Sequence, residues 1–156
     1  MVLTLEFYAT THNPLFDAVL ELDFDTIDSL QTPGQYADFS LHISPADLDL
    51  LSYEVCSALG EPSVSLREHL DTDGRFVDEP DRGAFVVRRE WVQLIASLEH
   101  NSVDAVVAGW CEEMRFVHDD PEISTTPECT EAITALVEAC QYAQETNTEV
   151  VHVWFA

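Results

Sequence analysis

The chain contains no lysine, and its six arginines all lie between positions 67 and 115. Against them stand 30 aspartates and glutamates, which give a formal net charge of -24 at pH 7. A charge of that sign repels the phosphates of nucleic acids and the surface of anionic membranes, and it speeds association with basic proteins. The composition therefore argues against nucleic-acid and membrane partners and favours a basic protein partner.

The motifs that mark common catalytic sites are missing as well. There is no G-x-S-x-G, S-x-x-K or H-E-x-x-H sequence and no phosphate-binding P-loop. The six histidines are scattered singly, at positions 12, 42, 69, 100, 118 and 152. We therefore expect a protein that is not an enzyme and needs no cofactor.

Signals for export and for membrane insertion are also lacking. The first residues, 1–6, carry no basic segment of the kind that opens a secretory signal, and no apolar run approaches the roughly 20 residues of a membrane span. The four cysteines have no C-x-x-C spacing, and three of them lie in stretches with helical periodicity. We expect reduced, buried thiols in a cytoplasmic protein.

Hydrophobic residues make up 46% of the chain, enough for an ordinary packed core in one domain spanning residues 1–156. Alternating apolar residues predict strands at 3–7, 39–43 and 84–87 and a last strand at 149–155. The last strand is apolar on both faces, so it should be central or covered on both sides. If the strands at the two termini pair, the acidic flanks of the chain would meet and could form one continuous negative face.

Helix starts are marked by a capping residue followed by proline. Asn13-Pro14, Ser44-Pro45 and Thr126-Pro127 have this pattern, and Ser102 is a further cap. The first helix, with apolar positions that include Leu20 and Phe24, should begin at 14 and break near 23–25, where Asp25 would cap a second turn. Residues 20–25 also alternate as a strand would. Further helices are expected at 64–70 and 91–98, and 71–83 is predicted to be a loop.

These elements predict an α+β or α/β fold, in which about five helices pack on a small sheet of about four strands that includes both chain termini. Their order in the sheet does not follow from the sequence.

Three acidic or thiol-containing segments are candidates for metal sites. Residues 71–81 resemble a calcium loop, but Gly74 comes at the fourth position and Arg75 and Arg82 bring positive charge. The acids of 112–122 could hold Mg²⁺ or Ca²⁺, although the segment also fits an ordinary helix end. Cys111, His118 and Cys129 lack the closely spaced pairs that zinc sites use. We predict no metal.

The most specific pattern made by the charge is an acidic row at Asp17, Glu21, Asp25 and Asp28, with no arginine nearby in the sequence. As a helix, this row would place like charges at i,i+4, which is mildly unfavourable. A solvated face is one interpretation, and a docking surface for a basic partner is the other. The predicted partner-binding residues are Asp17, Glu21, Asp25, Asp28, Asp71, Asp73, Asp78, Asp119, Asp120 and Glu122.

In size, charge and class the chain resembles the immunity proteins with which bacteria block toxins. The resemblance rests on no residue motif, so it transfers no functional residues. It implies a non-catalytic, antitoxin-like inhibitor of a basic toxin such as a nuclease, whose groove must be positive to hold phosphates. Two alternatives stay open: an acid-rich protein of a salty cytoplasm, and a small divalent-metal-dependent enzyme that uses residues 112–122.

Overall fold

A computed structural model describes residues 3–156 of the chain, so positions 1 and 2 of the predicted domain lie outside it. Over these residues it contains five strands and six α-helices in a single α+β domain. The strands are β1 (Thr4–Thr10), β2 (Tyr36–Asp38), β3 (Val77–Glu79), β4 (Arg82–Val86) and β5 (Glu149–Phe155). The helices are α1 (His12–Glu21), α2 (Phe24–Ser29), α3 (Pro45–Leu59), α4 (Arg89–Ala96), α5 (Val103–His118) and α6 (Pro127–Thr146).

The sheet is antiparallel throughout, in the order β2-β1-β5-β4-β3. The strands near the two termini pair over seven residues, from Thr4 opposite Phe155 to Thr10 opposite Glu149. β5 lies at the centre, as the sequence predicts, with Val150 in the core on one face and Val151 and Val153 in the core on the other.

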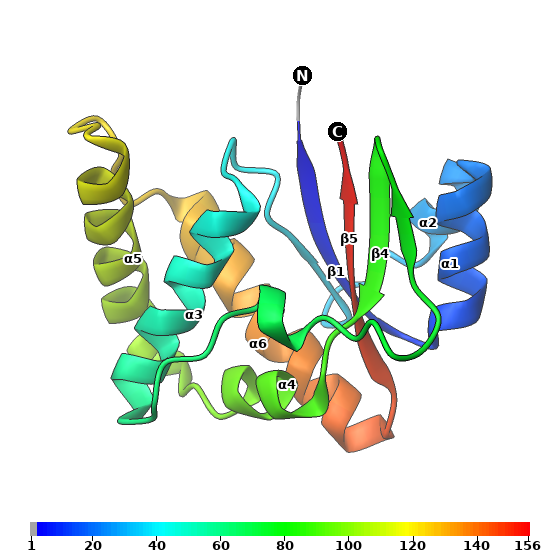
Figure 1. Cartoon of the computed structure of the whole chain (residues 1–156). Coiled ribbons are helices and arrows are strands. Elements are labelled where there is room, and N and C mark those ends of the chain that lie inside the picture. Colours follow the sequence, from blue (N-terminus) through cyan, green and yellow to red (C-terminus); the bar gives the residue numbers. More distant parts are fainter. Residues whose placement is uncertain (1–2) are drawn as a thin grey trace.

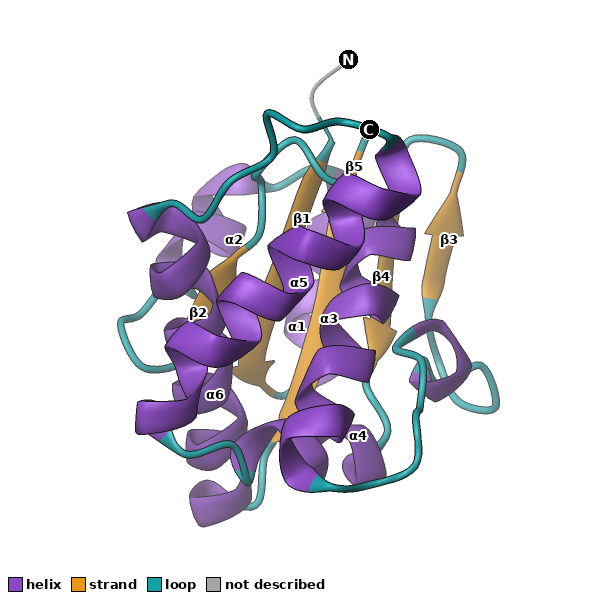
Figure 2. Ribbon diagram, turned by 90° about the vertical axis from the view of Figure 1, so that its left-hand side faces the viewer, coloured by secondary structure: helices purple, strands orange, loops and turns teal. Residues whose placement is uncertain are grey.

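Helices cover both faces of the sheet (Figure 1). The two short helices α1 and α2 pack on one face, against Tyr8 and Val151. On the other face α4 and α6 join the larger core around Phe7 and Trp91. Figure 2 shows α3, α5 and α6 in front of the sheet, and in Figure 1 α5 lies farthest from it, packed on α3 and α6. The outer face of α5 is therefore open to solvent.

Two polar side chains within the sheet, Glu6 and His152, have hydrogen-bond partners. Glu6 accepts hydrogen bonds from the hydroxyls of Tyr8 and Tyr36, and burial raises the pKa of its carboxyl. His152 stacks on Phe7, and a ring nitrogen of His152 hydrogen-bonds the main-chain oxygen of Glu6. Burial lowers the pKa of His152 to about 4. The central histidine is thus a neutral core residue.

Several sequence predictions hold. The Ser44 amide and hydroxyl both donate to the Asp47 carboxylate at the start of α3, and Gly60 ends that helix in the left-handed conformation. The Thr126 hydroxyl accepts a hydrogen bond from the amide of Cys129 and caps the start of α6. These starts were predictable because cap, proline and acid act within one turn of the chain.

Three local predictions were wrong. The segment 71–83 is not one loop, because β3 and the start of β4 form a hairpin in it. The second strand lies at Tyr36–Asp38 and not at 39–43, where His42 adopts a positive φ of 59° that interrupts extended structure. The first helix begins at His12 with Thr11 as its N-cap, two residues before the predicted start.

Candidate protein-binding surface

Three large apolar side chains are exposed where α1 meets α2. Leu20, Leu22 and Phe24 are 39%, 43% and 51% exposed. Glu21, Asp25 and Asp28 are exposed in the same stretch. We call the six residues Leu20, Glu21, Leu22, Phe24, Asp25 and Asp28 the 20–28 surface. It combines apolar contact area with a rim of negative charge, which is the anatomy of a protein interface.

The break between the helices produces this exposure. Leu22 takes a left-handed conformation with φ of 57°, and its amide closes α1 by donating to the main-chain oxygens of Ala18 and Val19. Asp23 then caps α2 by accepting hydrogen bonds from the amide and hydroxyl of Thr26. These bonds lower the pKa of Asp23. The predicted break is therefore confirmed, but its cap is Asp23 and not Asp25.

The turn at Leu22 redirects the chain, so the periodicity of one continuous helix does not apply across it. Phe16, Val19 and Ile27 are buried, whereas Leu20 and Phe24 are not. The ring centroid of Phe24 lies 5.4 Å from that of Phe155, and the Phe24 side chain is nevertheless half exposed. The helical spacing that groups Leu20 and Phe24 with these buried residues therefore does not place the two side chains in the core.

The sequence has no arginine near the acidic row, but the fold brings two arginines to it. Arg75 forms an ion pair with Asp17, donates to Asn13 and lies 5.6 Å from the centre of the Phe16 ring. Arg82 donates to the main-chain oxygen of Leu20. In residues 3–156 no ion pair reaches Glu21, Asp25 or Asp28. The uncompensated part of the row is therefore its second half.

The other predicted binding residues fall into two groups. Asp71, Asp73 and Asp78 lie in and before β3, beside α1, to which Arg75 ties this segment. Asp71 and Asp73 are not free, because Arg88 lies 4.0 Å and 3.2 Å from their carboxylate oxygens. Asp119, Asp120 and Glu122 follow α5 on the opposite side of the sheet (Figure 1). Arg75 ties the segment of the first group to Asp17, whereas Asp71 and Asp73 themselves lie at Arg88, and the second group lies apart.

A second acidic surface lies on the outer side of α5 and α3. Burial raises the pKa of Glu54, and the neighbouring carboxylates of Glu113 and Glu112 raise it further. One turn beyond them Phe116 is 84% exposed, and Val117 beside it is exposed. We call the five residues Glu54, Glu112, Glu113, Phe116 and Val117 the α5 surface. It offers two exposed apolar residues, Phe116 and Val117, where the 20–28 surface offers three.

The acids at the end of α5 do not converge on a metal site. His118 hydrogen-bonds the buried carboxylate of Asp47, 2.6 Å away, instead of joining Asp119 or Asp120. The amide of Glu122 donates to Asp120, as in a local turn. Within the described residues no group of three His, Cys, Asp or Glu side chains is arranged to hold an ion.

All four cysteines are buried as free thiols. Burial raises the pKa of Cys111 to about 11, and the adjacent thiol of Cys129 adds to that shift. Both cysteines line a cavity of about 1000 Å³ between α5, α6 and the segment before α3. Because its pKa is raised, the Cys111 thiol stays protonated, and a protonated thiol is a poor nucleophile and a poor metal ligand.

No helix in residues 3–156 is long and apolar enough to cross a membrane. Comparison with known proteins gives no guide to function, since no family model, curated protein or solved structure matches the chain. The surface must therefore be interpreted from its own chemistry.

Sequence reasoning located the acids of the 20–28 surface and missed its apolar centre. The signal was present in the alternation of residues 20–25, which places an acid after each apolar side chain. In a helix that breaks at Leu22, as in a strand, both the apolar and the acidic side chains of such a pattern can reach solvent. The alternation therefore indicates a surface segment, beside the ambiguity between helix and strand.

Proposed function

We propose that the protein is a non-catalytic binding protein of the immunity or antitoxin type, which neutralises a basic partner by docking the 20–28 surface onto it. The observation that carries the proposal is the exposure of Leu20, Leu22 and Phe24 among carboxylates that have no ion-pair partner in the described residues. Apolar residues at the centre of an interface supply affinity, and charges at its rim supply specificity and speed of association.

The chemistry of this surface selects the kind of partner. A second copy of the chain would bring Glu21 and Asp25 against acids of the same sign, which costs free energy. A positively charged protein would bind favourably to both the apolar residues and the carboxylates of the surface. A nuclease toxin fits because its substrate groove is basic, and a carboxylate surface that covers the groove also blocks access of the substrate phosphates. Nucleic acids and anionic membranes are disfavoured by the same charges.

We further propose that the protein works in the cytoplasm. Support comes from the four buried thiols, none of which is paired in a disulfide. A reducing compartment keeps such thiols free.

The test begins with capture of the partner by tagged protein from the native host, followed by association kinetics with the purified partner. The test variant carries Glu21→Lys, Asp25→Lys and Asp28→Lys, and it leaves the structural residues Asp17 and Asp23 intact. The control carries Glu131→Lys, Glu138→Lys and Glu145→Lys, three exposed positions on α6 across the sheet. Both variants change the net charge equally, so a general charge effect acts on both.

We expect the test variant to associate more slowly by on the order of tenfold at low salt, with a flatter dependence on ionic strength than the control. Phe24→Ser should mainly speed dissociation, since a central apolar contact forms late in docking. Equal rates for the two charge variants would refute the 20–28 surface. A selective effect of Glu112→Lys with Glu113→Lys would move the interface to the α5 surface. Capture of an acidic partner, or of none, would refute the proposed function itself.

A further inference from the structure

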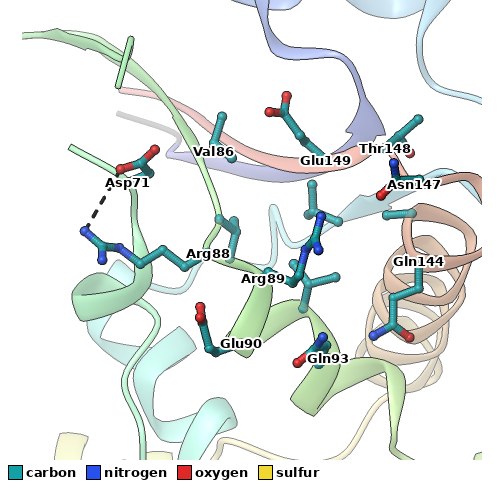
Figure 3. Close-up of a pocket in the computed structure, with 14 residues that line it drawn as sticks. Asp71, Val86, Arg88, Arg89, Glu90, Gln93, Gln144, Asn147, Thr148 and Glu149 are labelled. Atoms are coloured by element: carbon teal, nitrogen blue, oxygen red, sulfur yellow. Dashed lines mark ion pairs between the residues drawn. The ribbon is translucent and has the colours of Figure 1, made fainter. Parts of the chain in front are cut away.

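A cavity of about 580 Å³ opens between the first turn of α4, the end of α6 and the strands β4 and β5 (Figure 3). Its volume lies in the range of pockets that bind small molecules, roughly 300–1,000 Å³. It is separate from the 20–28 surface, because α4 and α6 cover the opposite face of the sheet.

The walls of this cavity divide by chemistry. Beside five charged side chains, the lining has an apolar part and a part made of neutral polar side chains that can donate hydrogen bonds. The apolar part is formed by Val86, Val87, Val92, Ala143 and Val150, and the polar part by Gln93, Gln144, Asn147 and Thr148. Such a division suits an organic molecule with an apolar body and one polar end.

Arg89 supplies the charge at the polar end. In residues 3–156 no hydrogen bond or ion pair involves its side chain, whereas each of the other five arginines contacts a carboxylate or a main-chain oxygen. In Figure 3 the Arg89 side chain extends into the cavity on the side of Asn147 and Gln144. Its guanidinium is thus placed among neutral donors, in a chain whose carboxylates outnumber its arginines five to one, 30 to 6.

The carboxylates around the cavity are largely engaged elsewhere. Asp71 lies beside Arg88, with 4.0 Å between the charged atoms, and Arg88 also reaches Asp73. Glu149 pairs with His12 at 2.6 Å. Glu90 is the remaining acid, and Figure 3 shows its carboxylate on the side of Arg88, away from the guanidinium of Arg89. Arg89 therefore remains available to an anion that enters from outside.

We propose that this cavity binds a small organic carboxylate, with the carboxylate on Arg89 and the apolar body on the valines of the wall. A guanidinium matches a carboxylate through two parallel hydrogen bonds. The apolar body matters because the net charge of the protein repels anions, so an inorganic ion would lack the burial energy that offsets this repulsion. The site is independent of the proposed partner surface.

The test is a titration of ¹⁵N-labelled protein with benzoate, followed by amide NMR shifts at constant ionic strength. Benzamide serves as the uncharged analogue and inorganic phosphate as the anion without an apolar body. We expect saturable shifts at Arg89, Gln144 and Asn147 with benzoate, and about tenfold weaker binding of benzamide and of phosphate, the ratio that 1.4 kcal/mol corresponds to. Arg89→Gln should remove the preference for benzoate over benzamide.

Arg75→Gln is the matched control, since it removes the same charge at a distant position on the other side of the sheet. It should leave benzoate binding unchanged. The proposal is overturned if benzoate gives no saturable shifts at these residues, if benzamide binds equally well, or if Arg89→Gln binds benzoate as the wild type does. Both arginines are at the surface, so we expect both variants to fold. Amide spectra of the free variants check that expectation.

Discussion

Gly83 and Gly109 each leave room for a neighbouring side chain, but the two neighbours differ in their freedom to move. A Cβ atom on Gly83 in β4 would lie 2.1 Å from Nε1 of Trp154 and 2.6 Å from its Cε2. The indole of Trp154 rests across the glycine from the paired strand β5. A Cβ atom on Gly109 in α5 would lie 2.3 Å from Oε2 of Glu54, the end of a long flexible side chain.

The two alanine variants should therefore have opposite effects. Gly83→Ala must displace a packed indole, and we expect it to lower the free energy of unfolding by about 1–3 kcal/mol. Gly109→Ala needs only a rotation of the Glu54 side chain, and the better helix propensity of alanine should leave stability unchanged or raise it by up to about 1 kcal/mol. Urea denaturation measures both, since urea adds no salt to a highly charged protein. A larger loss for Gly109→Ala than for Gly83→Ala would contradict this packing.

At the scale of elements, the sequence predicted those helix starts and strands that depend on residues adjacent in the chain. The starts of α3 and α6 depend on caps within one turn, and the strand at 149–155 is a run of β-branched and aromatic residues, so all three were found. The hairpin of β3 and β4 was not predicted, because the contacts that stabilise β3 lie outside it. Val77 pairs with Ala84 in β4 and packs in the core formed with α1. Pairing between distant segments leaves little trace in local composition.

The same limit applied to the candidate binding surface. The acids of the 20–28 surface were named from the sequence alone. The ion pair that occupies Asp17 was not, because Arg75 is 58 residues away in the chain. The cavity at Arg89 was likewise out of reach, since its walls come from three separate stretches of the chain that meet only in the folded sheet.

Leu22, between α1 and α2, adopts a left-handed backbone conformation that glycine would adopt with less strain. Non-glycine residues with φ near 57° are strained, and helices commonly end on glycine at this position. Leu22→Gly should therefore be more stable than Leu22→Ala by up to about 1 kcal/mol, as both lose the side chain and only glycine relieves the backbone. We expect both to weaken partner binding equally.

Urea denaturation of the two variants, together with their affinity for the captured partner, checks this pair of expectations. Unimpaired binding by both variants would show that the exposed leucine contributes nothing to the interface. A less stable glycine variant would show that the left-handed conformation is not a source of strain.

For the whole molecule, the arrangement of charge differs from the single negative face that pairing of the termini had suggested. The strands β1 and β5 do pair, but the exposed acids of the flanks lie on helices that cover opposite faces of the sheet. Glu21 and Asp25 are on one side, and Glu131 and Glu138 on the other. Negative charge therefore surrounds the molecule. Apolar contact area added to the charge distinguishes two sides for docking, the 20–28 surface with its three apolar residues and the α5 surface with Phe116 and Val117.

Charge distributed in this way destabilises the fold by self-repulsion, and salt should relieve it. We expect the protein to be folded in dilute buffer, with a Tm that rises by a few degrees as NaCl increases from about 10 mM to about 0.5 M and then levels off, because the Debye length is by then only a few ångströms. An acid-rich protein of a salty cytoplasm behaves differently, since it requires molar salt to fold. Thermal unfolding across NaCl and KCl series separates the two. Unfolding below about 1 M KCl would favour the salty-cytoplasm alternative and remove the need for a basic partner to explain the charge.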